Sequence, residues 1–132
     1  MVATTNVDGS NPGPNTVSLP DTVQMPTGNV WKVGSFTLTL SPASVANATG
    51  AEQTFTMTGL LTTDIVVVQK PTTQAGLVIG GSRVSAAGVI AINFANVTSA
   101  TITPTASEAY QVLVVRVQPN WTAPSTGSVI DW

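Results

Sequence analysis

Threonine and valine dominate this chain of 132 residues, with 21 and 19 copies respectively. Both side chains are β-branched, and β-branched residues fit the pleated surface of a strand better than the crowded surface of a helix. No segment shows a sustained period of 3.6 residues, so we expect little helix. The length suits one domain, or one domain that carries extended arms. The sequence therefore predicts an all-β protein.

Alternation of side chains locates the first strands. Residues 34–40 alternate between apolar and hydroxyl side chains, which places Phe36 and Leu40 on one face of a half-buried strand. Residues 54–58 repeat the pattern, with the two apolar side chains inward. The hairpin signal at Ala87–Gly88 separates two further runs. These patterns are typical of short antiparallel strands.

Two more apolar runs predict strands in the middle of a sheet. Residues 65–68 are continuously β-branched, which favours a central strand buried on both faces, and residues 110–117 form the longest and most apolar run. The remaining predicted strands are short: residues 77–79, 83–86, 89–94 and 101–103. Seven to eight short strands, with turn signals about every 8–12 residues, predict an antiparallel β-sandwich or jelly-roll-like domain. A small closed barrel is the alternative.

The ends of the chain differ from this β-rich body. Proline and glycine interrupt residues 1–30 every few positions, and its isolated apolar residues are too sparse for a core. We expect residues 1–30 to form an extended N-terminal arm, 31–118 the β-sandwich domain and 119–132 a C-terminal tail. Both ends are expected to dock on a neighbouring subunit or to fold back on the body. The interface candidates are Val17, Leu19, Val23, Met25, Trp31, Trp121, Ile130 and Trp132.

Missing residue types exclude several kinds of chemistry. The chain has no Cys and no His, which removes disulfides, thiolate metal sites and the Ser–His–Asp triad. Four Lys and Arg residues are too few to track a phosphate backbone, so we expect no nucleic-acid partner. No apolar run reaches the roughly 18–20 residues that span a bilayer, and the first residues do not resemble a signal peptide. We therefore expect no membrane association, no metal and no cofactor.

The candidate catalytic groups are weak. Glu52 and Glu108 precede predicted strands and are the best carboxylate pair for glycoside hydrolysis, but solvated charges at strand ends explain them more simply. A nucleophile–base set could be formed by Ser82 beside Arg83, or by a hydroxyl residue with Lys70. In a chain so rich in hydroxyl residues, such a combination is expected by chance. We predict no catalytic residues and no enzymatic activity.

The shortage of charge is the more informative feature. Charged residues make up 8% of the chain, against about 25% in ordinary soluble domains. Soluble β proteins commonly protect the edges of their sheets with charge, above all with Lys. A β domain without that protection is expected to assemble through its surfaces. This favours a structural subunit of a large assembly, and the low net charge of −2 limits repulsion between identical copies.

Part of the chain resembles a known class of proteins. Residues 51–116 resemble small virion proteins of tailed bacteriophages, of the head decoration (cement) or head-fibre type. The stretches that carry the resemblance are residues 51–60, 64–71, 74–77, 83–88, 90–96, 102–106 and 110–112. Residues 1–50 and the tail take no part in it.

The resemblance implies a virion protein on the outer surface of the capsid. Its partners would be the major capsid protein and further copies of itself, with a trimer favoured, and its role would be to reinforce the head by adding interface. The alternative is a head-fibre or tail-fibre-associated module that contacts host surface glycans. That role requires an exposed aromatic platform, for which the chain offers Trp31, Trp121, Trp132 and Tyr110.

Overall fold

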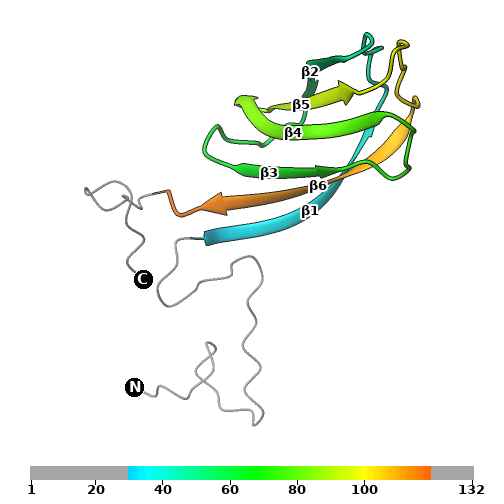
Figure 1. Ribbon diagram of the computed structural model, residues 1–132. Helices are drawn as coiled ribbons and strands as arrows, with labels where there is room; N and C mark the ends of the chain where they lie inside the picture. The colour runs from blue at the N-terminus through cyan, green and yellow to red at the C-terminus, as the bar shows by residue number, and fades with distance from the viewer. Residues whose placement is uncertain (1–29, 120–132) are drawn as a thin grey trace, which may run out of the picture.

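The computed structural model describes residues 30–119 (Figure 1). These residues form six strands and no helix, and hence no helix able to cross a membrane. The strands are β1 (Val30–Leu40), β2 (Thr49–Thr56), β3 (Ile65–Gln69), β4 (Leu77–Ala86), β5 (Val89–Asn96) and β6 (Glu108–Val117). The prediction of an all-β protein is confirmed over this range.

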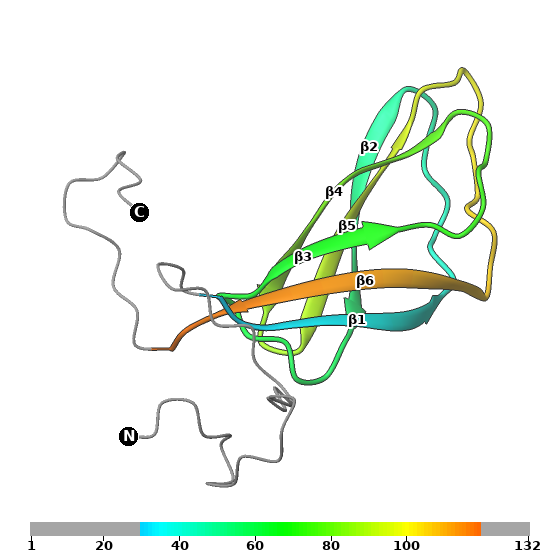
Figure 2. The same ribbon diagram turned by 90° about the horizontal axis from the view of Figure 1, so that it is seen from below.

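The strands form two antiparallel sheets of three strands each. One sheet has the order β1-β6-β3, and the other has the order β2-β5-β4. Figure 2 shows them as separate layers whose strands cross at an angle. β6 is the central strand of the first sheet, as the apolar run at 110–117 predicts. It is not the longest strand, because β1 has 11 residues and β6 has 10.

The two central strands supply most of a shared core. Ile90, Ile92 and Phe94 of β5 are fully buried, as are Tyr110 and Val112 of β6. The rings of Phe94 and Tyr110 meet edge to face, with centroids 6.3 Å apart. Such an aromatic pair stabilises a fold by about 0.5–1.5 kcal/mol beyond the area that it buries. The core therefore lies between the two sheets.

The predicted count of seven to eight strands is wrong, because two predicted strands belong to one. Residues 77–79 and 83–86 both lie in β4, which continues through Gly80 with a shift of register between Ile79 and Gly81. A Cβ atom on Gly80 would lie 2.9 Å from Asn93 Oδ1, so the missing side chain permits a close approach of β4 to β5. The glycines bend the strand without ending it.

A third predicted strand, residues 101–103, also fails to form. The backbone there makes a single bridge, between Ile102 and Val45, with N···O distances of 2.8 and 3.0 Å. Pro104 stops any longer pairing, because it has no backbone donor. Two connecting loops are nevertheless tied together at this point.

The prediction for residues 65–68 is wrong in its placement. This run forms β3, which lies at the edge of its sheet and, within residues 30–119, pairs only with β6. Val66 is buried, whereas Ile65 and Val67 are 58% and 57% exposed. A continuous apolar run indicates burial on both faces only where a second layer covers each face. The described residues cover the inner face alone.

Candidate functional site

Four charged side chains mark the ends of β3 and β6. Asp64 immediately precedes β3 and Lys70 immediately follows it, while β6 begins at Glu108 and carries Arg116 near its end. Because the two strands run antiparallel, each end of the pair brings together one acid and one base. The four charges therefore form two ion pairs, which fix the register of β3 on β6.

The first ion pair is bidentate, and its carboxylate is buried while the Arg116 side chain is 23% exposed. Arg116 donates from Nε to Asp64 Oδ1 at 2.7 Å and from Nη2 to Asp64 Oδ2 at 2.6 Å. Nη2 also donates to the carbonyl of Gly59, and the Leu61 amide donates to Asp64 Oδ2 at 2.8 Å. The Asp64 side chain is fully buried. The hydrogen bonds from Arg116, with help from the Leu61 amide, hold the pKa of Asp64 below its ordinary value.

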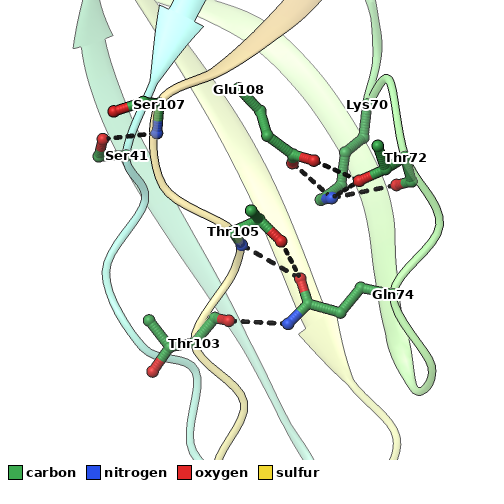
Figure 3. Close-up of polar contacts among 8 residues, drawn as sticks. All are labelled: Ser41, Lys70, Thr72, Gln74, Thr103, Thr105, Ser107 and Glu108. Atoms are coloured by element: carbon green, nitrogen blue, oxygen red, sulfur yellow. Dashed lines mark hydrogen bonds and ion pairs between the residues drawn. The ribbon is translucent and has the colours of Figure 1, made fainter.

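The second ion pair lies at the opposite end and includes a threonine (Figure 3). Lys70 Nζ lies 2.5 Å from Glu108 Oε2 and donates to the Thr72 carbonyl and hydroxyl at 3.0 and 2.9 Å. The Thr72 hydroxyl in turn donates to Glu108 Oε1. Both charged side chains are 9% exposed. The hydrogen bonds from Lys70 and then Thr72 lower the pKa of Glu108.

Glutamine and serine side chains extend this cluster into a junction of loops (Figure 3). Gln74 donates to the Thr103 carbonyl at 2.7 Å and accepts from the Thr105 amide at 3.2 Å. The Ser107 amide donates to Ser41 Oγ at 2.9 Å. These bonds join the β3–β4 loop, the β5–β6 loop and the end of β1. We call the group of Lys70, Thr72, Gln74 and Glu108 the loop junction.

The loop junction holds its charged groups in mutual contacts. Lys70 donates to the carbonyl and hydroxyl of Thr72 and is ion-paired with Glu108, and the Thr72 hydroxyl donates to the carboxylate of Glu108. An ion-paired ammonium is a donor, so it does not serve as the base that would activate Thr72. Ser82, the other candidate nucleophile, donates to the Val66 carbonyl at 2.9 Å. The arrangement is suited to holding loops in place.

The carboxylate pair suggested by the sequence is not brought together as a pair. Glu52 lies on β2 and accepts two hydrogen bonds from Arg83 of β4, at 2.9 and 2.7 Å, whereas Glu108 belongs to the other sheet. A glycosidase acid needs a raised pKa. The hydrogen bonds from Arg83 to Glu52 and from Lys70 to Glu108 shift both pKa values downward. In residues 30–119, each acidic side chain is ion-paired with a base.

Two of the aromatic candidates are described by the structure. Trp31 lies in β1, partly buried, with Lys32 Nζ 4.8 Å from the centroid of its ring. Tyr110 is fully buried, so its place in an exposed aromatic platform is a prediction that the structure contradicts. Burial, with a smaller effect of the Glu108 charge, raises the pKa of Tyr110 to about 12. The other interface candidates lie outside the described residues: Val17, Leu19, Val23, Met25, Trp121, Ile130 and Trp132.

The first sheet has an apolar surface that was not predicted from the sequence. Directly paired residues of an antiparallel sheet share a face. The pairing therefore aligns Val33 with Val115 and Ile65, and Leu113 with Val67, on the side away from the core. We call these five residues the outer apolar face. Four of them are at least 40% exposed. The signal was present in the sequence, because residues 112–115 are all apolar, so that both faces of the strand are apolar there.

The rest of the outward surface of the first sheet is mostly polar. Further along the sheet, the outward residues are Ser35, Thr37, Thr39, Gln69, Ala109 and Gln111. None of the outward positions named for this surface carries a charge. No group of three or more metal-ligating side chains occurs between residues 30 and 119. In that range, the sites with distinctive chemistry are the two ion pairs at the ends of β3 and the outer apolar face.

Comparisons with protein-family models, with curated proteins and with solved structures gave no match to this chain. The bacteriophage resemblance therefore stays an expectation from the sequence.

The buried ion pairs make stability depend on pH. The pKa values of Asp64 and Glu108 lie below their ordinary values of 3.8 and 4.5, so the unfolded chain binds protons more readily than the folded chain. The stability that these groups contribute is present above the ordinary values and is lost as the pH falls below about 4. We expect the free energy of unfolding in urea to be lower at about pH 3 than at pH 7.

A control separates the buried pairs from the exposed one. Glu52→Gln removes the carboxylate of the exposed pair, and we expect this variant to keep most of the fall in stability between pH 7 and pH 3. Equal free energies of unfolding at both pH values in the unmodified protein would contradict the assignment of Asp64 and Glu108 as stabilising anions.

Proposed function

We propose that this chain is a structural virion protein of a tailed bacteriophage, and specifically a capsid decoration (cement) protein that binds the major capsid protein and stabilises the head. We also propose that its two sheets form a β-sandwich, since their central strands share one core. The observation that carries the functional proposal is the outer apolar face, which is uncharged and largely exposed.

An exposed apolar face of this kind favours a protein partner. Contiguous apolar surface on a folded domain commonly marks an interaction site. Complete burial of a valine, leucine or isoleucine side chain contributes about 1.5–3 kcal/mol. Covering several half-exposed ones therefore contributes a few kcal/mol. The acidic side chains of the described body are engaged in ion pairs, so the surface that remains for a partner is apolar and hydroxyl-rich. A protein that reinforces a shell needs added interface and no catalytic group.

The resemblance to phage virion proteins supplies the identity of the partner. A cement protein on the outside of the capsid would cover junctions between capsid subunits with its apolar face. The residues of the arm and tail that the sequence analysis singled out would add to the contact, because a sheet face three strands wide is small beside the roughly 800 Å² per partner of a standard interface. Association with further copies of this chain belongs to the same proposal.

Binding to purified capsid shells that lack this protein tests the proposal. We expect the chain to co-sediment with shells in a saturable manner and to be protected from limited proteolysis there. Val67→Lys places a charge in the outer apolar face at an exposed position and is expected to weaken binding at least tenfold. Thr54→Lys is the matched control, because Thr54 is exposed on β2 of the other sheet. This control is expected to bind like the unmodified chain.

Two outcomes would contradict the proposal. Shells that neither bind the chain nor protect it would exclude decoration. Equal loss of binding in Val67→Lys and Thr54→Lys would show that the outer apolar face is not the contact. Binding to a host-surface polysaccharide in place of shells would instead favour the fibre-associated alternative.

A further inference from the structure

Within the part of the chain that the structure describes, the two sheets have four edge strands, namely β1 and β3 in the first sheet and β2 and β4 in the second. An edge strand presents unpaired backbone donors and acceptors to any strand that approaches it. Proteins commonly protect such edges by keeping them short, by bulges, by charge or by covering them. The four edges of this protein differ in that protection.

Three of the edges are protected. β3 has five residues, and its Val66 carbonyl accepts a hydrogen bond from Ser82 of β4 at 2.9 Å. β4 has two shifts of register, and it carries Arg83. β2 is covered in part by the chain that follows β1, because the Gln53 side-chain amide exchanges two hydrogen bonds with the backbone of Ala43, at 2.7 and 2.9 Å. Each edge therefore has at least one feature that opposes pairing with another chain.

Residues 33–40 of β1 lack these features, although β1 has a shift of register between Val30 and Lys32 and carries Lys32 at its start. Its register with β6 is regular from Lys32 to Leu40, and residues 33–40 contain no proline and no charge. Among residues 30–119, β6 is the one strand that pairs with β1. Figures 1 and 2 both show β1 at the outer margin of its sheet. This eight-residue stretch is long enough for a stable ladder, and we call it the β1 edge.

The inner side of the β1 edge carries an incompletely covered aromatic ring. Phe36 pairs with Val112, which faces the core, yet Phe36 is 50% exposed. Its ring lies over Gly34, where a Cβ atom would come within 2.6 Å of Phe36 Cε2. The described residues of the second sheet do not extend far enough to bury this ring. A further strand beside β1 would supply the missing cover.

We propose that β1 of a second copy pairs antiparallel with the β1 edge, so that two copies share one six-stranded sheet across a two-fold axis. Identical antiparallel strands are complementary to each other, and each residue contact then occurs twice. The absence of charge in residues 33–40 means that no like charges face each other in this arrangement. The pairing brings the two Phe36 rings to the middle of the interface and places the two outer apolar faces on the same side of the shared sheet, at its opposite ends.

This inference is independent of the proposed function, because it concerns the chain in solution without capsid shells. It also differs from the trimer that the phage resemblance implies. A two-fold β1 interface closes at two copies, so the mass of the free protein separates the two expectations. Two other occupants of the β1 edge are a strand from a capsid protein and another segment of this chain. In either case the free protein would not form a two-fold dimer.

Sedimentation of the full chain tests the inference. We expect a species of twice the chain mass of 13.5 kDa that dissociates on dilution. The double variant Ser35→Lys, Thr39→Lys places charges on the outward side of β1, where lysines of the two copies would face each other. Its dimer dissociation constant is expected to rise at least tenfold. The control Thr54→Lys, Thr56→Lys adds the same charges to the β2 edge and is expected to dimerise normally. A monomer, a trimer or equal effects of both double variants would overturn the inference.

Cross-linking provides a second readout that does not depend on the lysine variants. The chain has no cysteine, so a single introduced cysteine can form only an intermolecular disulfide. We expect oxidised dimers when Ser35, Thr37 or Thr39 is replaced by Cys, most efficiently at the position nearest the two-fold axis, where the Cα atoms approach to about 4.4–6.8 Å. Thr54→Cys is the control. Cross-linking at Thr54 equal to that on β1, or none at the three β1 positions, would contradict the proposed pairing.

Discussion

Arg116→Met is expected to lower the free energy of unfolding by about 3 kcal/mol, because it leaves a buried carboxylate without its counter-charge. Asp64 is fully buried and takes two of its three hydrogen bonds from Arg116. Methionine keeps the apolar stem of the arginine but supplies no donor. For a domain of this size the midpoint of thermal unfolding should fall by about 10 °C or more. Urea denaturation monitored by tryptophan fluorescence measures the change.

Two further variants isolate the cause. Arg83→Met makes the same substitution in the exposed ion pair of Arg83 and Glu52, in which the two side chains are 60% and 40% exposed. We expect this variant to leave the free energy of unfolding nearly unchanged. The double variant Asp64→Leu, Arg116→Met removes both charges and should be more stable than Arg116→Met alone. If Arg83→Met were as damaging as Arg116→Met, burial of the ion pair would not be the source of the effect.

Asn96→Ala is expected to lower the free energy of unfolding by about 3 kcal/mol, because several buried hydrogen bonds are lost together. Asn96 is 2% exposed. Its amide donates to the carbonyls of Val45 and Ala100 at 3.0 and 2.7 Å, and its oxygen accepts from the Thr98 amide and hydroxyl at 2.9 and 2.8 Å. The side chain thus uses its full hydrogen-bonding capacity to hold two loops together. Calorimetry or urea denaturation measures the loss.

Asn47→Ala is the matched control, because Asn47 is exposed in the same loop as Val45. We expect this variant to change the free energy of unfolding by less than about 0.5 kcal/mol. A similar loss in both asparagine variants would mean that the loop tolerates no substitution, and that the buried amide of Asn96 has no special role.

Local patterns predicted most of the strands, since alternation is a property of a few neighbouring residues. The half-buried strand at residues 34–40 and the hairpin at Ala87–Gly88 are confirmed. Predictions that needed knowledge of the opposite layer were wrong. The run at 65–68 has the composition of a central strand, but its place at an edge depends on which strands pair with β6. Likewise, the sequence does not reveal whether a strand ends at Gly80 or continues through it. That depends on how closely Asn93 of β5 approaches Gly80.

The ion pairs and the outer apolar face were harder to predict for a related reason. Glu108 lies far along the chain from Lys70 and Arg116 far from Asp64, so no spacing motif links the partners. The useful signal is the position of opposite charges at the two ends of apolar runs, which becomes meaningful only once β3 and β6 are known to pair. Among the interface candidates, the structure places Trp31 alone, and those of the arm and tail lie outside the described residues.

The pairing of Val30 with Val117 has a mechanical consequence. Among residues 30–119, the first strand begins at Val30 and the last ends at Val117, so a force that separates the two ends of this body would act at one end of the β1–β6 ladder. Because the strands are antiparallel, such a force would break the hydrogen bonds of the ladder one after another and would not load them all at once. The body is therefore weak to tension between its own two ends. A head-stabilising role would require the load to cross the body through its lateral contacts, along the direction of the strands, where many hydrogen bonds resist together.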